Sequence, residues 1–202
     1  MTGERLDSLG LWDALAATAP ERLTEQFGRE GAGDVVPPAI EHLRSRSVEL
    51  IADDSPARRL ARRIGRTMPI IYGGGVPGLD AATCWKSACN LHAKLPAFAN
   101  EIVAVTHEEI CGWGQNGDVT RQVFSLILLR HSGESPDEAA AFDVVADICD
   151  EIVADVHTVV AQGPNRLAEL CDLVLFGDVV SLELAAVAGV DPGPTPILER
   201  FT

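Results

Sequence analysis

Apolar residues recur along this 202-residue chain with two different periods. Helical spacing predicts helices over residues 6–26, 37–50, 56–66, 79–94, 135–153 and 165–188, the last with a bend near Gly177. Short, almost wholly apolar runs predict buried parallel strands over residues 68–72, 101–105, 123–129 and 157–160. Strands that alternate with helices are typical of a parallel sheet wrapped by helices, so the pattern favours an α/β domain.

Two of these helices have clear start signals. Ser55 precedes Pro56 and Ser135 precedes Pro136, which places a capping hydroxyl before a proline in the first helical turn. Between the first strand and its helix, Gly73, Gly75 and Gly78 match the GxGxxG pattern of dinucleotide sites.

The rest of that dinucleotide signature is absent. The predicted second strand ends at Val105, Thr106 and His107, without the carboxylate that would hold a ribose, and Pro77 lies inside the turn. We therefore interpret the glycines as a strand-to-helix turn whose helix N-terminus is open to an anion, and we predict no cofactor.

Charge and composition narrow the function further. The chain has 16 Lys and Arg against 30 Asp and Glu, a net charge of −14, which argues against a nucleic-acid or anionic-membrane partner. No apolar run approaches the ~20 residues of a membrane span, and the N-terminus does not resemble a signal peptide. Five cysteines without CxxC spacing predict a reduced, cytoplasmic protein.

Several ordered blocks carry the most specific signal. They are MPIIYG from residue 68, CWKSACNLHAKLPA from residue 84, HEEICGW from residue 107 and GDVVSLELAAVAGVDPGPTP at residues 177–196. This series resembles the C-terminal half of the bifunctional phosphoglucose/phosphomannose isomerases, a branch of the sugar isomerase (SIS) fold. The corresponding family blocks are PxIYG, RWKxQxNENAKxPA, HNEIVGW and a closing helix with VDPTP.

The resemblance covers about residues 55–202. It implies a three-layer α-β-α sandwich with a five-stranded parallel sheet and a helical N-terminal extension. We expect residues 1–50 to form that extension, as a dimerisation segment, and residues 51–202 to form the SIS-like domain. The first SIS domain of the family, with its Ser- and Thr-rich phosphate cradle, has no counterpart here, because no SxSGxT-like stretch occurs.

The family's catalytic residues are only partly retained. Its proton-transferring glutamate aligns with Leu91, the arginine before WK aligns with Cys84, and its C-terminal lysine falls near Thr202. The family histidine linked with sugar-ring opening aligns with His107.

Three residues are candidates for catalysis. His92, beside the lost glutamate, has a side chain suited to proton abstraction near neutral pH, provided that the helix end bends it toward the same cavity. His107 follows a predicted strand end, where open α/β sheets place ligands. Glu109 lies two residues further on and either orients His107 or faces solvent. A metal site built from these three lacks a spacing motif and is not predicted.

Substrate-binding candidates gather in the same segment. Lys86 and Lys94 are the only two lysines beside 14 arginines, and both align with family lysines. Lys94 binds an anion, forms a Schiff base or belongs to an ion pair of the fold. The remaining candidates, with core packing as the alternative for the tryptophan, are Asn90, Gly74, Gly75 and Trp113.

These observations favour an isomerase-like or lyase-like enzyme that moves a proton with histidine on a sugar-derived or polar carbonyl metabolite, in specialised biosynthesis. We expect a homodimer with the site at the subunit interface and a small-molecule substrate. Two alternatives stay open: a non-catalytic ligand-binding or regulatory SIS protein, and one subunit of a two-chain sugar-phosphate isomerase.

Overall fold

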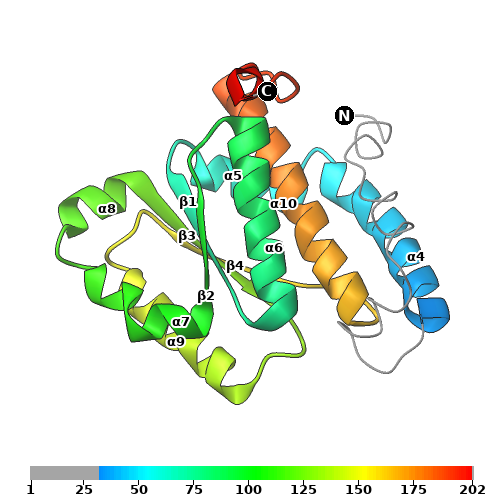
Figure 1. Ribbon diagram of the computed structural model, residues 1–202, viewed down its shortest axis with the longest axis horizontal. Coiled ribbons are helices and arrows are strands. Elements are labelled where there is room, and N and C mark those ends of the chain that lie inside the picture. Colours follow the sequence, from blue (N-terminus) through cyan, green and yellow to red (C-terminus); the bar gives the residue numbers. More distant parts are fainter. Residues whose placement is uncertain (1–31, 202) are drawn as a thin grey trace.

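A parallel four-stranded sheet forms the centre of the molecule, as the computed structural model of residues 32–201 shows (Figure 1). The predicted helix over residues 6–26 lies outside this described part. The strands follow the order β2-β1-β3-β4. Their bounds are β1 Met68–Gly73, β2 Phe98–Glu101, β3 Phe124–Arg130 and β4 Val156–Val160.

Helices occupy both faces of the sheet. They are α4 Ala32–Ile51, α5 Pro56–Ile64, α6 Gly75–Ala88, α7 Ile102–His107, α8 Gly117–Val123, α9 Pro136–Cys149 and α10 Arg166–Ala188. Three short turns complete the described part: a π-helical turn η1 at Cys89–Ala93, and 3-10 turns η2 at Glu109–Gly112 and η3 at Leu198–Phe201. The prolines predicted to open the second helix lie inside α4, which begins at Ala32.

Alternate residues of the strands face two separate cores. Ile71, Ile127 and Val159 pack under α4, α5, α6 and α10. Tyr72 and Leu128 pack on the opposite side, under α7 and α9. Since side chains alternate along a strand, a wholly apolar strand requires helices on both faces. The structure therefore confirms the α/β architecture with a parallel sheet.

The expected number of strands was wrong for the described residues. Four strands are present instead of five, which leaves β4 at the sheet edge. Beside β4 lies a cavity of about 600 Å³ bounded by residues of α4, α5 and α10. At this edge, Val160 is 59% exposed.

The second strand also differs from its prediction. Residues 101–105 were expected to be a strand, but β2 ends at Glu101 and α7 begins at Ile102. The physical reason is a helix cap, because the Glu101 carboxylate accepts a hydrogen bond of 2.7 Å from the backbone N–H of Ala104. The β-branched residues of this run therefore lie in a short helix, with Val105 buried.

Helix α10 organises one side of the fold and lies beside both α6 and α4 (Figure 1). The Trp85 indole of α6 donates a 2.7 Å hydrogen bond to the Leu173 carbonyl and stacks on Phe176. Toward α4, the fully buried Asp172 accepts a 2.7 Å hydrogen bond from Arg46 Nε. These contacts fix α10, whose C-terminal half carries part of the site described below.

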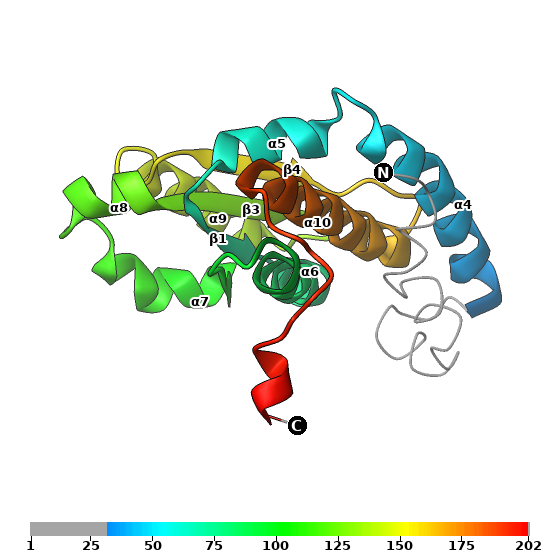
Figure 2. The ribbon, with the colours of Figure 1, turned by 90° about the horizontal axis from the view of Figure 1, so that it is seen from above.

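The helix caps predicted from the sequence are confirmed. Ser55 accepts a hydrogen bond from the Arg58 backbone at 3.1 Å, and Ser135 forms a capping box with Glu138. After α10 the chain extends away from the body and ends in η3 (Figure 2). Within residues 32–201, every helix is too short or too polar to traverse a lipid bilayer.

Candidate functional site

The end of α6 has an unusual backbone. The helix passes into the π turn Cys89–Ala93, and the N–H of Leu95 closes on the Cys89 carbonyl at 3.2 Å. Lys94 follows with φ of +54°, which makes it the only non-glycine residue with positive φ in the described part of the chain. Both π turns and left-handed non-glycine residues concentrate at functional sites.

Asn90 holds this turn in place. Its side-chain oxygen accepts a hydrogen bond of 3.1 Å from the Ala97 backbone N–H, across the loop that leads into β2. The Asn90 amide oxygen is thereby engaged in closing the loop. Asn90 supports the geometry of residues 90–97, and its predicted contact with substrate remains a prediction.

The imidazole of His92 lies half-buried against α10. Its Nδ1 atom is 2.8 Å from the Ser181 hydroxyl oxygen, and that hydroxyl donates a 2.7 Å hydrogen bond to the Asp178 carbonyl. Burial, followed by the positive charge of Lys94, lowers the pKa of His92 below its ordinary value of 6.5. His92 is therefore a neutral imidazole near pH 7.

The two lysines have different surroundings. Lys94 Nζ donates a 2.5 Å hydrogen bond to the Leu91 carbonyl, and both residues are exposed. This places the ammonium group on the same turn as His92. Lys86 is exposed in the last turn of α6, where its charge is favourable for the helix dipole.

Asp178 is a site residue that the sequence interpretation missed. Its carboxyl group is largely buried between α10 and α6, and this burial raises its pKa to about 7. Burial raises the pKa of the neighbouring Cys89 thiol to about 12, with a smaller contribution from Asp178. A protonated thiol is a poor nucleophile, so the Cys89 sulfur is unsuited to covalent catalysis at neutral pH.

A second polar group lies on the opposite side of the sheet. The Glu109 carboxylate accepts a hydrogen bond from the Tyr72 hydroxyl and one of 2.7 Å from the Asn100 amide. Trp113 donates to the Tyr72 hydroxyl at 3.3 Å and makes an edge contact with Phe124. Burial, followed by the Glu109 contact, raises the pKa of Tyr72 above its usual value, so the phenol is neutral.

Tyr72, Asn100 and Glu109 line a cavity of about 400 Å³. Its walls are Ile70, Tyr72, Phe98, Ala99, Asn100, Glu109 and Phe124. The Glu109 hydrogen bonds within the described residues run to Tyr72 and Asn100, and none of them runs to His107. The orienting role suggested for Glu109 thus has no supporting contact here.

His107 is the last residue of α7 and is exposed. The sequence placed it after a strand, but the helix α7 intervenes between it and β2. His92 precedes β2, and His107 follows both β2 and α7. The two histidines do not share either cavity described above.

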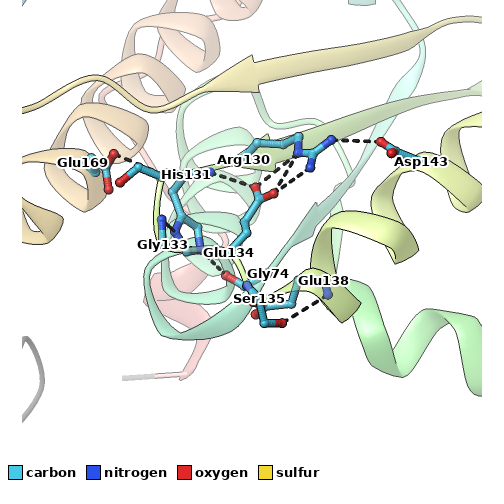
Figure 3. Close-up of polar contacts among 10 residues, drawn as sticks. Gly74, Arg130, His131, Gly133, Glu134, Ser135, Glu138, Asp143 and Glu169 are labelled. Atoms are coloured by element: carbon cyan, nitrogen blue, oxygen red, sulfur yellow. Dashed lines mark hydrogen bonds and ion pairs between the residues drawn. The ribbon is translucent and has the colours of Figure 1, made fainter.

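The glycine turn is closed by protein groups (Figure 3). The Gly74 carbonyl accepts a 2.9 Å hydrogen bond from His131 Nε2. Gly75 has φ of +54°, and a Cβ there would lie 2.8 Å from a carboxylate oxygen of Glu138. Because this carboxylate occupies the start of α6, it repels an anion at Gly74 and Gly75.

Other charged groups around this turn also contact protein groups. Arg130 binds Glu134 at 2.7 Å and Asp143 at 3.1 Å, and Ser132 N–H donates to Glu169 at 3.2 Å (Figure 3). Within residues 32–201, no three His, Cys, Asp or Glu side chains gather as metal ligands. The π turn, with its π-helical backbone and the left-handed Lys94, is therefore taken as the candidate site.

Comparison with known proteins identifies the family. Residues 53–202 match the bacterial phospho-glucose isomerase C-terminal SIS domain. The chain belongs to this SIS family. The resemblance found in the sequence is thereby confirmed, and the SIS domain accounts for the parallel sheet and its covering helices.

Individual relatives agree with this assignment. The bifunctional phosphoglucose/phosphomannose isomerase of Caldicellulosiruptor bescii is 29% identical over 156 residues, which cover 77% of this chain and 46% of that protein. The protein of the same name from Aquifex aeolicus is 26% identical over 144 residues, covering 71% of this chain and 44% of that protein. The SIS chain described here therefore spans about half the length of the curated relatives it matches.

A solved structure shows the same fold. The glucose-6-phosphate isomerase like protein from Thermus thermophilus has a TM-score of 0.61 at 21% identity, over 82% of this chain and 54% of that chain. This similarity supports the arrangement of sheet and helices in the SIS domain described above.

A sequence signal for the missed residues does exist. Asp178 and Ser181 are polar residues three positions apart in an otherwise apolar stretch of the SIS closing helix. Residues spaced i, i+3 share a helix face, so the pair marks a polar spot on a helix that is otherwise buried.

Proposed function

We propose that this SIS chain is a sugar-phosphate isomerase-like enzyme in which His92 acts as the general base. The observation that carries the proposal is the half-buried, neutral imidazole of His92 on the π turn, with the Lys94 ammonium on the same turn. The relatives' names, phosphoglucose/phosphomannose isomerase, support hexose phosphates as the substrate class.

The proposed chemistry is a proton transfer between adjacent carbons. His92 takes a proton from the carbon next to the substrate carbonyl, and the electrons of that C–H bond form the C=C bond of an enediolate. Lys94 stabilises the negative charge on the enediolate oxygen. The imidazolium returns the proton to the neighbouring carbon while a proton passes between the two oxygens, so no atoms are gained or lost. General base catalysis of this kind contributes about 10²–10⁴-fold in rate.

The substitution of glutamate by Leu91 is compatible with this role. Leu91 is 43% exposed and carries no proton-accepting group. The adjacent His92 lies in a π turn rather than in a regular helix, which alters the direction of its side chain relative to an α-helical position. The π turn supplies the bent helix end that was expected from the sequence for a histidine base next to the former glutamate position, and the shared cavity expected with it stays a prediction.

We also propose a site shared between two copies of the chain. Within one chain, His92 and His107 share neither of the two cavities. In the proposed homodimer, the His107 of a second copy lies at the π turn. A proposed two-fold axis repeats the arrangement, so each dimer contains two equivalent sites.

Solvent isotope exchange tests the proton transfer. The full chain is incubated with glucose 6-phosphate, mannose 6-phosphate or fructose 6-phosphate in D₂O, and loss of the C1 or C2 proton signal is followed by NMR. We expect exchange with at least one sugar and a drop of at least about 10²-fold in His92→Gln. His42→Gln, a histidine of α4 outside the site, is the control. Exchange that survives in His92→Gln would exclude His92 as the base.

Mixing of variants tests the shared site. His92→Gln and His107→Gln are each expected to be inactive alone. Random exchange of subunits yields hybrid dimers with one intact site, which restores about a quarter of the wild-type rate. If hybrid dimers form in native mass spectrometry without restored exchange, the shared site is wrong.

The exposed Leu91 also favours a second candidate, a ligand-binding SIS protein without chemistry. In that case the same sugar phosphates bind in calorimetry, but no deuterium enters them with the wild-type chain.

A further inference from the structure

Ser181 lies at the contact between α10 and the π turn. Its side chain is completely buried, and it belongs to the same helix face as Asp178. The hydroxyl oxygen is 2.8 Å from His92 Nδ1 and donates its hydrogen to the Asp178 carbonyl at 2.7 Å. Both contacts lie within the normal range for hydrogen bonds.

These two contacts together determine the protonation of the imidazole. A serine hydroxyl has one hydrogen and two acceptor lone pairs. If the hydrogen is directed to the Asp178 carbonyl, the contact with His92 Nδ1 is a hydrogen bond only when Nδ1 carries the proton. In a neutral imidazole the second nitrogen, Nε2, then holds the lone pair.

We propose that Ser181 is a positioning residue that holds His92 as the Nδ1–H tautomer and leaves Nε2 as the basic atom. The catalytic consequence rests on the function proposed above, whereas the tautomer itself does not. The arrangement corresponds in logic to the carboxylate that fixes a catalytic histidine in a serine protease, with a neutral hydroxyl in place of the charge.

The surroundings hold the Ser181 residue in place. Ser181 is fixed by a helix that also contacts α4, α5 and α6, so its position does not depend on the π turn alone. Burial, followed by the positive charge of the Lys94 ammonium, lowers the pKa of His92 and favours the neutral imidazole. Nε2 of His92 acts as a base at neutral pH only when the imidazole is uncharged and its proton is on Nδ1.

Nitrogen NMR of the full chain labelled with ¹⁵N-histidine tests the tautomer directly. The His92 signals are assigned by their loss in His92→Gln. In the wild type we expect the long-range ¹H–¹⁵N pattern of an Nδ1–H imidazole at pH 8. In Ser181→Ala, which removes the acceptor without adding volume, we expect the Nε2–H form to become the major species.

Ser87→Ala provides a matched control. Ser87 lies on α6 and donates a hydrogen bond to the carbonyl of Thr83, but it has no histidine partner. We expect this variant to leave the His92 pattern unchanged. A wild-type Nε2–H pattern, or an unchanged pattern in Ser181→Ala, would overturn the assignment of Ser181.

Kinetics separate the two proposals. With the isotope-exchange assay, Ser181→Ala is expected to lower kcat about 10–100-fold with KM little changed, the size typical when a partner that orients a metal-bound histidine is lost. If His92 of the wild type is the Nδ1–H tautomer but no isotope exchange occurs, the positioning role of Ser181 stands and the proposed enzymatic function is wrong. If His92 of the wild type is the Nε2–H tautomer and isotope exchange does occur, the proposed enzymatic function stands and the positioning role of Ser181 is wrong.

Discussion

Gly177 of α10 lies directly against the indole of Trp85 on α6. A Cβ at Gly177 would be 2.4 Å from both Cδ1 and Nε1 of Trp85. The missing side chain therefore permits the two helices to approach closely enough for the indole to reach the Leu173 carbonyl. The α6–α10 contact also sets the position of the π turn relative to Ser181.

We expect Gly177→Ala to lower the free energy of unfolding by about 2–3 kcal/mol, because the fully buried Trp85 has no room to move. Urea unfolding measures the change. Gly112→Ala, where a Cβ meets nothing within 4 Å, is the control with little expected effect. Additive losses in Trp85→Phe combined with Gly177→Ala would contradict the direct contact.

The buried ion pair between α4 and α10 gives a second prediction. Arg46→Leu leaves the fully buried Asp172 carboxylate without its guanidinium partner, so we expect a loss of about 3–5 kcal/mol. Arg44→Leu, on the same helix but in an exposed pair with Glu41 at 3.8 Å, should cost less than about 1 kcal/mol. Thermal and urea unfolding measure both variants. Equal losses of stability in Arg46→Leu and Arg44→Leu would refute the distinction between the two pairs.

Asp178 predicts a dependence of stability on pH. Its pKa rises from 3.8 in the unfolded chain to about 7 in the folded chain. A raised folded pKa means that the stability contribution is complete below pH 3.8 and is lost as the pH rises through 7.

Asp178→Asn removes this titration. Relative to wild type, the variant should gain stability between pH 4 and pH 8, toward ~4 kcal/mol for a pKa difference of about three units. Urea unfolding at a series of pH values measures the difference, with the exposed Asp118→Asn of α8 as the control. A difference between Asp178→Asn and wild type that stays constant with pH would refute the prediction.

The left-handed backbone at Lys94 allows a substitution that affects stability and activity in different directions. Glycine adopts this conformation without steric cost, so Lys94→Gly should retain or raise stability, by up to about 1 kcal/mol. Lys86→Gly, in the last turn of α6, should lose about 1 kcal/mol. In the isotope-exchange assay Lys94→Gly is nevertheless expected to be strongly impaired. Full exchange activity in this variant would remove Lys94 from the mechanism.

Helices and strands were predicted correctly where the local sequence pattern and the packing in the fold favour the same secondary structure. The apolar run of β3 and the serine caps of α5 and α9 are local features, and the structure has them where the pattern placed them. The run from Ile102 to Val105 was mistaken for a strand. Its β-branched composition favours a strand, but the Glu101 cap and the packing of α7 on α9 decide the outcome.

The candidate site was predictable in part for the same reason. His92 and Lys94 were found from their positions in a family block, and the structure places both on one turn. Asp178 and Ser181 are distant in sequence and meet the π turn only because α10 packs against it. Conversely, Gly74 and Gly75 resembled an anion site because the sequence does not reveal that Glu138 folds over them.

The positive φ of Lys94 has an evolutionary consequence. Stability alone favours glycine or asparagine at this position, since both tolerate the left-handed region better than lysine. A lysine here accepts that steric cost, and its ammonium group lies on the turn that carries His92. In related chains that do not use the ammonium group, we expect glycine or asparagine at this position.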